Sequence, residues 1–227
     1  MLKKIILSDR QLGFIEKLIV STVSIILLSV PYFIIGKIKH NRLSSEILLT
    51  QYDLKIPLIP LTIWYYLGGL YLSILLIVFL LKDRKNFYHS IFTSISTAFF
   101  CFSVFYFFPV PYPRPIFQSF GKLSSTQNHD IMYLFFDKIN LKMLNQIYLL
   151  DENINTFPSL HVAYCFIFFL GLIPEYSKLS LLFALNFVLI YITTLTTKQH
   201  FIVDGIAGIV VSLFFYFLCK KIIYSKK

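Results

Sequence analysis

The sequence predicts an all-α, polytopic membrane protein with six transmembrane helices, and three observations carry this prediction. Of the 227 residues, 57% are hydrophobic and only 14% are charged, whereas about 25% of the residues of a soluble domain are charged. The mean hydropathy is +0.72. The apolar residues are gathered in long runs. Together these features exclude a disordered chain, a coiled coil and most soluble folds.

Six apolar runs approach the length of about 20 residues that a helix needs to cross a bilayer. A short polar turn, Pro174–Lys178, separates the fourth run from the fifth, and nothing in the sequence divides residues 1–227 into more than one integral-membrane domain. Charged residues precede the first run and no small-residue cleavage site follows it, which predicts an uncleaved anchor. The expected spans are residues 18–35, 58–81, 90–108, 158–173, 179–195 and 201–218.

The basic residues predict the orientation of these spans. The formal net charge is +10, and we attribute it to membrane topology rather than to nucleic-acid binding. With six spans, 12 of the 21 Lys and Arg residues fall on the side of both termini and 9 on the opposite side. The positive-inside rule then places both termini in the cytoplasm. The three cysteines lie inside apolar runs, so we expect buried thiols and no disulfide framework.

The segment 110–157 is the only stretch long enough to build structure on the outer side. Residues 130–150 have the pattern of a helix lying at the membrane interface. Two interpretations remain open for it, and a structural surface helix is favoured over a substrate lid. Its apolar stripe contains Met132, Phe135, Phe136, Ile139 and Met143.

Ionisable and polar residues near the span ends are the candidate functional residues, because such groups are costly in a membrane. Six-span topology brings them all to the outer side. They are Arg114 after the third span, Ser159 and His161 at the start of the fourth, and Lys198, His200 and Asp204 between the fifth and sixth.

The start of the fourth span has the features of an anion-binding helix end. Asn155 or Thr156 can cap a helix there, and Pro158 suits a first helical turn. The free N–H groups of that turn, with the helix dipole, favour an anion. Ser159 adds a hydroxyl donor and His161 a titratable donor. The alternative is an ordinary capped helix with a histidine that reaches the interface.

His200 and Asp204 are four residues apart, so on a helix they share a face. The carboxylate can accept a hydrogen bond from one ring nitrogen and leave the other free to attack. With a second histidine as acid and nearby cations, this set suits phosphoryl transfer. A metal site made of His161, His200 and Asp204 is the alternative. It does not explain the cations Arg114 and Lys198.

Two motifs resemble those of the type 2 phosphatidic acid phosphatase (PAP2) superfamily. The segment Phe157–Ala163, Phe-Pro-Ser-Leu-His-Val-Ala, resembles its Pro-Ser-x-His motif, and Thr197–Asp204, Thr-Lys-Gln-His-Phe-Ile-Val-Asp, resembles its His-x-x-x-Asp motif. The details look most like the branch that includes inositol phosphorylceramide synthases. Residues 52–57 and 148–155 also match, so the resemblance extends from about residue 52 onward.

The resemblance implies a six-helix PAP2-like core and a role for each candidate. It implies that His200 is the nucleophile that forms a phosphohistidine, that Asp204 supports it, and that His161 protonates the leaving group. It also implies that Ser159, Arg114 and Lys198 bind phosphate. Neither a metal nor an organic cofactor is implied.

The chain departs from the common superfamily pattern at two places. The pattern has a Lys seven residues before Arg114, where this chain has Phe107, and a Ser-Arg pair where it has Thr193 and Thr194. Two phosphate-binding cations are therefore absent, and Lys198 is a candidate substitute for one of them.

We therefore expect a membrane lipid phosphatase or phosphotransferase whose partner is a lipid phosphate or diphosphate in the bilayer. Hydrolysis is favoured, and headgroup transfer to an alcohol is the alternative. A non-catalytic lipid-binding protein or transporter ranks lower, because the charges lie near span ends and not at mid-depth. The abundance of Phe, Tyr, Ile, Lys and Asn favours an AT-rich bacterial genome. The expected location is then the inner membrane, with the site on the periplasmic or extracellular face.

Overall fold

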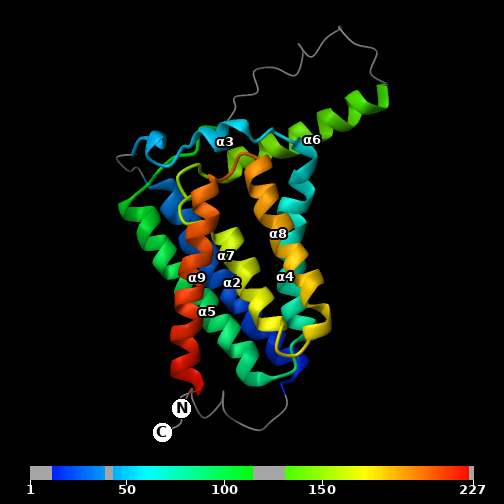
Figure 1. Ribbon diagram of the computed structural model, residues 1–227, viewed down its shortest axis with the longest axis vertical. Helices are drawn as coiled ribbons and strands as arrows, with labels where there is room; N and C mark the ends of the chain where they lie inside the picture. Colours follow the sequence, from blue (N-terminus) through cyan, green and yellow to red (C-terminus); the bar gives the residue numbers. More distant parts are fainter. Residues whose placement is uncertain (1–11, 39–42, 115–130, 225–227) are drawn as a thin grey trace.

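A computed structural model describes residues 12–38, 43–114 and 131–224, and every regular element in them is helical (Figure 1). The elements are α2 (Phe14–Lys37), η1 (Ser45–Ile47), α3 (Gln51–Lys55), η2 (Pro60–Thr62), α4 (Ile63–Leu80), α5 (Arg84–Phe107), α6 (Ile131–Leu150), α7 (Leu160–Leu172), η3 (Ser177–Leu179), α8 (Ser180–Thr196) and α9 (Ile202–Tyr224). Helices α2, α4, α5, α7, α8 and α9 stand side by side as a bundle, and α3 and α6 lie across its upper end.

Five of these helices are long and apolar enough to cross a membrane: α2, α4 with the preceding η2, α5, α8 with the preceding η3, and α9. The prediction of a helical membrane protein is therefore confirmed. The helix expected at 158–173 is α7, which has 13 residues and a length of only about 20 Å. A bilayer core is about 30 Å thick. The count of exactly six spans stays a prediction.

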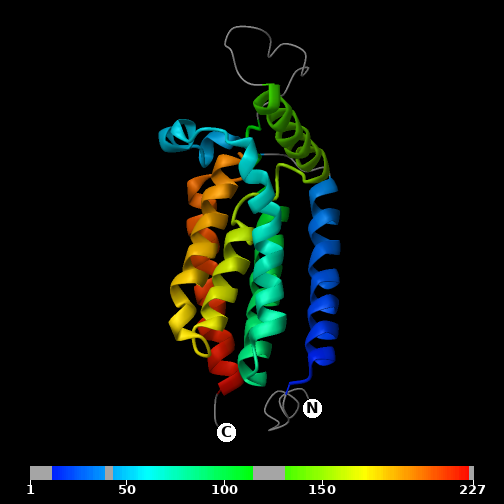
Figure 2. The ribbon, with the colours of Figure 1, turned by 90° about the vertical axis from the view of Figure 1, so that its right-hand side faces the viewer.

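Helix α7 is short because the chain enters the bundle before the helix begins. The segment between α6 and α7 descends from the upper end into the bundle (Figures 1 and 2). Helix α7 then packs against α4, α5, α8 and α9. Helix α7 is surrounded by other helices and begins inside the bundle, below its upper end. Its first residues are therefore enclosed by protein.

Helix α5 begins at Arg84 and not at residue 90, so that predicted boundary was wrong. The sequence prediction followed the apolar run and missed the cap. The Asp83 side chain accepts hydrogen bonds from the N–H groups of Lys85 and Asn86, which starts the helix earlier. Polar side chains of the first turns are paired inside the protein. Asn86 donates to the carbonyl of Gly171, and His89 lies 2.9 Å from the carbonyl of Tyr216.

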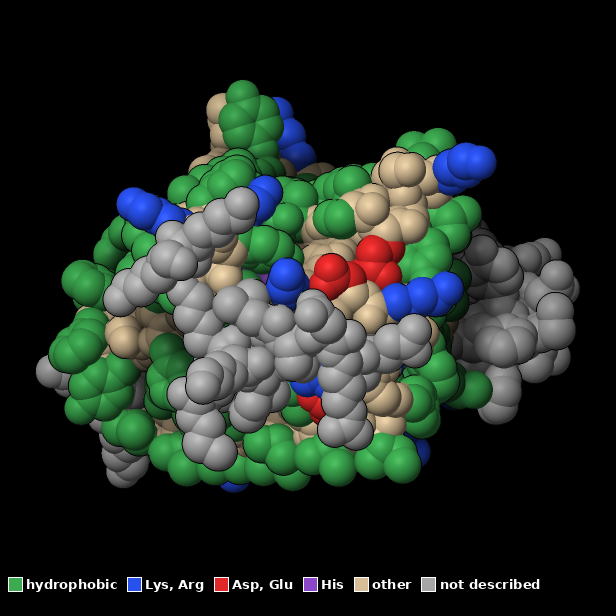
Figure 3. Space-filling view, turned by 90° about the horizontal axis from the view of Figure 1, so that it is seen from below, with side chains coloured by type: hydrophobic (Ala, Val, Ile, Leu, Met, Phe, Trp, Pro, Cys, Tyr) green, Lys and Arg blue, Asp and Glu red, His purple; other side chains and the backbone are tan. Residues whose placement is uncertain are grey.

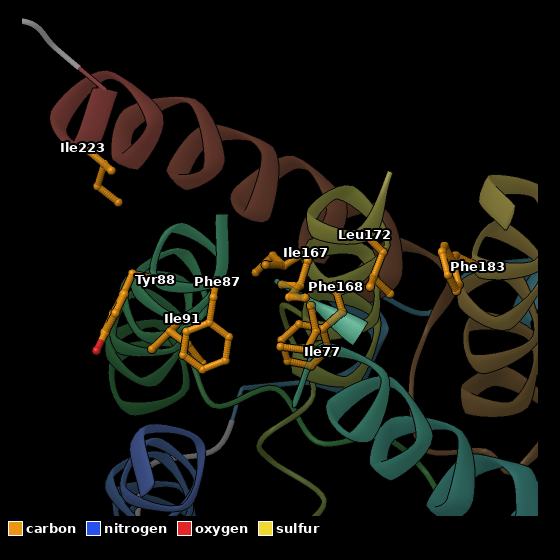
Figure 4. Close-up of a cluster of buried hydrophobic side chains, with 10 residues drawn as sticks. Ile77, Phe87, Tyr88, Ile91, Ile167, Phe168, Leu172, Phe183 and Ile223 are labelled. Carbon is orange, nitrogen blue, oxygen red and sulfur yellow. The ribbon is translucent and has the colours of Figure 1, made fainter. Parts of the chain in front are cut away.

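The largest buried cluster lies in the lower half of the bundle, where α4, α5, α7, α8 and α9 meet (Figure 4). Phe87, Ile167 and Leu81 are almost completely enclosed. The three cysteines are buried and free, as expected. Hydrophobic side chains cover the sides of the molecule, and Lys and Arg side chains stand over the lower end (Figure 3).

The interfacial helix predicted at 130–150 is present as α6, at the upper end of the bundle. Among its described side chains, Leu144 and Asn140 are buried, and Leu144 packs with Ile63 and Tyr66. Asn140 accepts a hydrogen bond from the Trp64 indole at 2.8 Å. Ile139, placed on the predicted apolar stripe, is 37% exposed. The side chains of Met132, Phe135 and Phe136 lie outside the described residues.

The first residue of α2 and the last residue of α9 lie at the same, lower end of the bundle (Figures 1 and 2). The connection from α8 to α9 lies at the upper end. The candidate functional residues are therefore gathered at the end of the bundle opposite Phe14 and Tyr224.

Candidate active site

His200 lies between α8 and α9, and its ring is fixed by two acceptors on the same nitrogen. Its Nδ1 lies 2.9 Å from the carbonyl oxygen of Thr156 and 3.2 Å from Oδ2 of Asp204. Because both partners accept, we assign the ring proton to Nδ1. The other nitrogen, Nε2, has no hydrogen-bond partner among the described residues. The ring therefore presents an unprotonated nitrogen with a free lone pair.

Local backbone contacts explain this position of His200. The carbonyl of Thr194, in the last turn of α8, accepts hydrogen bonds from the N–H groups of Gln199 and His200. Asp204 is fully buried in the first turn of α9, and its Oδ2 also accepts the N–H of Phe201 at 2.9 Å. One carboxylate oxygen thus satisfies a free helix-end donor and orients the histidine.

Burial lowers the pKa of His200 from its usual 6.5 to about 4. Desolvation is the largest cause, since a charged ring loses its hydration inside protein. Asp151 and the Thr156 carbonyl oppose the shift, and the nearby Arg114 guanidinium adds to it. The imidazole is consequently neutral at neutral pH, which is the state that can act as a nucleophile or base.

His161 is the second residue of α7 and faces His200. The ring centroids of the two histidines are 6.2 Å apart. His161 is stacked on Tyr66 with a centroid distance of 4.5 Å, and the Tyr66 hydroxyl lies 3.4 Å from its Nδ1. The Ser159 N–H also donates to the Asp204 carbonyl at 2.9 Å, which holds the two helix starts together. Both imidazoles can therefore contact one phosphate-sized group.

Ser159 caps α7, so the expectation that Asn155 or Thr156 caps it was wrong. The Ser159 hydroxyl accepts the N–H of Val162 at 3.4 Å. Thr156 and Asn155 are used elsewhere: the Thr156 hydroxyl donates to the Val110 carbonyl, and the Asn155 amide donates to the Tyr32 carbonyl. They therefore fasten the loop that precedes the helix.

The N-terminal end of α7 lies beside the two histidines. By helix geometry, the N–H groups of Leu160 and His161 have no acceptor within the helix. Together with the positive end of the helix dipole, they make this position favourable for an anion.

Arg114 lies at the edge of this cluster and is nearly buried. It donates to the carbonyls of Tyr148 and Asp151 and to Oε1 of Gln199, the residue before His200. Its guanidinium also lies 3.6 Å from the Asp151 carboxylate. Its Nε and the Nε2 of Gln199 are buried donors without an acceptor in the described part of the chain. Two buried donors of this kind suit an anionic ligand.

Lys198 is directed elsewhere. Its ammonium donates to the backbone carbonyls of Asp53 at 3.1 Å and Ile56 at 2.5 Å. Its backbone has a φ of 54°, in the left-handed region. Among the described residues, the hydrogen bonds of Lys198 thus join the His200 loop to α3 and its C-cap residue Ile56, and none joins Lys198 to either histidine.

Asp53 is a structural member of this region that the candidate list lacked. It is 2% exposed. One carboxylate oxygen accepts the N–H of Ile202 at the start of α9 (2.7 Å), and the other accepts the N–H and hydroxyl of Thr50. Its place in the matching segment 52–57 was the only signal in the sequence.

Asp151 and Tyr66 were also missed by sequence reasoning. Asp151 accepts a hydrogen bond from the Tyr32 hydroxyl at 2.6 Å and pairs with Arg114, so it joins α2 to the site. Burial raises the pKa of Asp151, and the Arg114 charge opposes that shift. Tyr66 resembles any other aromatic residue of an apolar span, and only the fold reveals its contact with His161.

The three residues considered for a metal site do not surround a common point. Asp204 lies on the Nδ1 side of His200, whereas His161 faces the ring from the other helix. Within the described ranges, no three His, Cys, Asp or Glu side chains are placed to hold a metal ion.

Three positions depart from the superfamily pattern. Thr193 and Thr194 have structural roles, and Phe107 has none in the described part of the chain. Phe107 is 69% exposed at the end of α5. The Thr193 and Thr194 hydroxyls donate to carbonyls one turn back on α8. Their own carbonyls accept from Thr197 and from the His200 loop.

Comparison with known protein families gives one match. A family model described as the PAP2 superfamily matches residues 43–218. The match includes α3 to α8, most of α9 and every candidate residue named above, whereas α2 precedes it. Searches of curated proteins and of solved structures returned no match.

Proposed function

The chain belongs to the PAP2 superfamily, and we propose that it is a membrane enzyme that cleaves a lipid phosphate or diphosphate through a phosphohistidine at His200. Superfamily membership suggests phosphatase-type activity. The observation that carries the proposal is the free Nε2 of a neutral His200 whose Nδ1 is held by Thr156 and Asp204.

In the first step, Nε2 of His200 attacks phosphorus and a nitrogen–phosphorus bond forms. The bond from phosphorus to the lipid oxygen breaks, and a protonated His161 gives its proton to that oxygen. The positive charge that develops on His200 is stabilised by Asp204, which accepts the Nδ1 hydrogen bond. In the second step His161 takes a proton from water, and the water oxygen bonds to phosphorus. The nitrogen–phosphorus bond breaks, which returns the lone pair to Nε2 of His200 and releases inorganic phosphate.

The phosphate oxygens need donors that are already in place, because preorganised donors stabilise the transition state best. The N-terminus of α7, Arg114 Nε and Gln199 Nε2 are such donors. This assignment makes Gln199 a binding residue in addition to Arg114 and Ser159. For Lys198 we propose a positioning role, since its ammonium is used by two carbonyls.

A second candidate is transfer of the phosphoryl or headgroup to an alcohol in place of water. The Leu variant of the first motif and the Thr-Lys-Gln-His form of the second favour it, since both resemble inositol phosphorylceramide synthases. The first step is the same in both cases, and only the group that attacks the phosphohistidine differs.

The proposed location is a bacterial plasma membrane, with the termini in the cytoplasm and the site on the outer face. The position of the site, at the end of the bundle opposite Phe14 and Tyr224, supports it. A cysteine introduced near residue 127 would react with a membrane-impermeant thiol reagent from outside. Reaction only from the cytoplasmic side would overturn the orientation.

The function is tested with protein purified in detergent and offered phosphatidic acid, a polyprenyl diphosphate and a phosphoinositide, each with and without a free alcohol. Phosphate release supports the phosphatase, and headgroup exchange supports the transferase. Activity that persists unchanged in His200→Ala would refute the mechanism. Activity should also survive EDTA, and loss that one divalent metal restores would support the metal alternative.

A further inference from the structure

A cavity of about 250 Å³ lies between α2 and the other helices of the bundle. Residues of α2, α4, α5 and α7 line it, and most of them are hydrophobic. His161 and Tyr32 also line it, and both belong to the site region described above. The cavity therefore reaches His161, one member of the histidine pair.

Helix α2 forms one wall of this cavity and is fastened near both of its ends. Near its lower end Glu16 pairs with both terminal nitrogens of Arg84 at 2.6 Å, and Lys17 donates to the Leu81 carbonyl. Near its upper end the Tyr32 hydroxyl donates to Asp151. Figure 2 shows α2 at one side of the bundle. Polar contacts thus hold both ends of α2 against the bundle, and the cavity lies beside the middle part of this helix.

Small side chains contribute part of the lining of this cavity. Ser21, Ser24 and Ser29 of α2 and Ser94 of α5 line the cavity. The hydroxyls of Ser24 and Ser94 donate to carbonyls one turn back on their own helices, so they offer little polarity. Two large residues of α2, Val23 and Ile26, face outward and are each 58% exposed. Helix α2 therefore lines the cavity with its serines together with Ile25, Leu28 and Phe33, whereas Val23 and Ile26 are not among the lining residues.

We propose that this cavity holds the hydrocarbon chain of the lipid whose phosphate group reacts at His200, and that α2 thereby selects chain length. The proposal rests on the proposed function. An apolar cavity open to a bilayer fills with hydrocarbon, because a void forfeits packing contacts. A chain that ends in a phosphate is the occupant that also satisfies the anion-binding groups beside His161.

The depth of the cavity supports a length-measuring role. Ser29 is one turn before Tyr32, near the site, and Ser21 is eight residues further down α2, which is about 12 Å along the axis. A short chain stays near Ser29, whereas a longer one extends to Ser21. Because α2 precedes the matched range 43–218, this selectivity comes from a helix outside the part of the chain that the superfamily shares.

The test uses saturated alkyl phosphates of increasing length and three phenylalanine variants. Ser21→Phe blocks the far end of the cavity. It should keep activity on short chains and lower kcat/KM on long ones, by about fourfold for each methylene that no longer finds a buried place. Ser29→Phe blocks the near end and should lower activity at every length. Val23→Phe, on the outward face of the same helix, is the matched control and should keep the wild-type profile.

If Ser21→Phe has the same chain-length profile as Val23→Phe, the proposal is overturned. A second measurement does not depend on turnover or on folding of these variants. His200→Ala is labelled with an alkyl phosphate that carries a photoreactive group on its chain. Adducts on the cavity residues of α2 and α7, reduced by unlabelled alkyl phosphate but not by the matching alkyl alcohol, support the site.

Adducts elsewhere, or equal competition by the alcohol, would show that the cavity takes bilayer lipid or detergent and would overturn the proposal. The two experiments also separate this inference from the proposed function. Specific adducts without any turnover by the wild type would reject the reaction and keep the chain site. Turnover by the wild type, together with an unchanged length profile in Ser21→Phe, would keep the reaction and reject the chain site.

Discussion

Oδ2 of Asp204 lies 3.2 Å from Nδ1 of His200 and, at the same time, 2.9 Å from the N–H of Phe201. One oxygen atom therefore serves the start of α9 and the orientation of the imidazole. Asparagine keeps an oxygen that can accept from both groups but removes the negative charge, so this substitution separates the hydrogen bonds from the charge.

Asp204→Asn should thus retain the fold and lose activity. The asparagine oxygen can still accept from Phe201 and from Nδ1, but without the carboxylate charge the positive charge of the attacking ring is not compensated. We expect kcat to fall about 10²–10⁴-fold with a nearly unchanged unfolding temperature. The measurement is steady-state kinetics on a lipid phosphate, together with thermal unfolding in detergent.

Asp83→Asn is the matched control for that substitution. Asp83 caps α5 through the N–H groups of Lys85 and Asn86, at the end of the bundle opposite the histidines. This variant should keep full activity. If Asp204→Asn were as active as Asp83→Asn, the assigned role of Asp204 would be wrong.

The acid limb of the pH dependence of kcat/KM reports the ionisation of His200 in the free enzyme, because His200 must be neutral to attack, whereas the need for a protonated His161 limits activity on the alkaline side. Burial lowers the pKa of His200 from 6.5 to about 4, so the neutral ring predominates above that pH and the protonated ring below it. Activity should therefore be retained as the pH falls through 6.5, and its acid limb should have a midpoint at about 4. An acid limb centred at 6.5 would contradict the buried, neutral nucleophile. Preincubation at each pH followed by assay at neutral pH corrects for unfolding.

Gly208 of α9 faces the start of α7, and a Cβ added there would overlap the carbonyl oxygen of Ser159. Gly208→Ala should displace the helix start that carries His161. We expect a loss of about 1–3 kcal/mol of stability from overpacking and a fall in kcat. Gly68→Ala is the control, because nothing lies within 4 Å of a Cβ at Gly68. Equal thermal stability of the two variants would contradict this close packing.

Asp53 should matter for stability, because Asp53→Ala leaves the N–H of Ile202 and the Thr50 cap without their acceptor. A loss of about 1–3 kcal/mol is expected for buried groups left unpaired. Glu46→Ala, at an exposed residue of the neighbouring η1, should change stability by less than about 0.5 kcal/mol. Thermal unfolding of both variants checks this, and a destabilised Glu46→Ala alone would contradict it.

Hydropathy was sufficient to predict most of the fold, because a bilayer forces each spanning segment into an apolar helix. The predictions went wrong where a side chain sets a boundary that hydropathy does not register. Asp83 starts α5 six residues before the apolar run, and Ser159 starts α7 after the loop has entered the bundle.

In the site, the spacing of His200 and Asp204 predicted their contact, which is present at 3.2 Å, although His200 lies before the start of α9 and not on the same helix face. Contacts between distant segments had no such local signal. The Thr156 carbonyl reaches His200 across 44 residues, and Lys198 reaches Asp53 across 145. Lys198 could equally have faced the phosphate, and only the packing of α3 on the His200 loop decides its direction.

The central claim is a covalent phosphohistidine at His200, and trapping it is the most direct test. The protein is mixed with a lipid phosphate labelled on phosphorus, quenched in alkali, and digested for mass spectrometry. The account predicts an alkali-stable, acid-labile phosphoryl group on His200 in the wild type and none in His200→Ala. Turnover without that adduct, or a phosphoryl group on another residue that persists in His200→Ala, would contradict it.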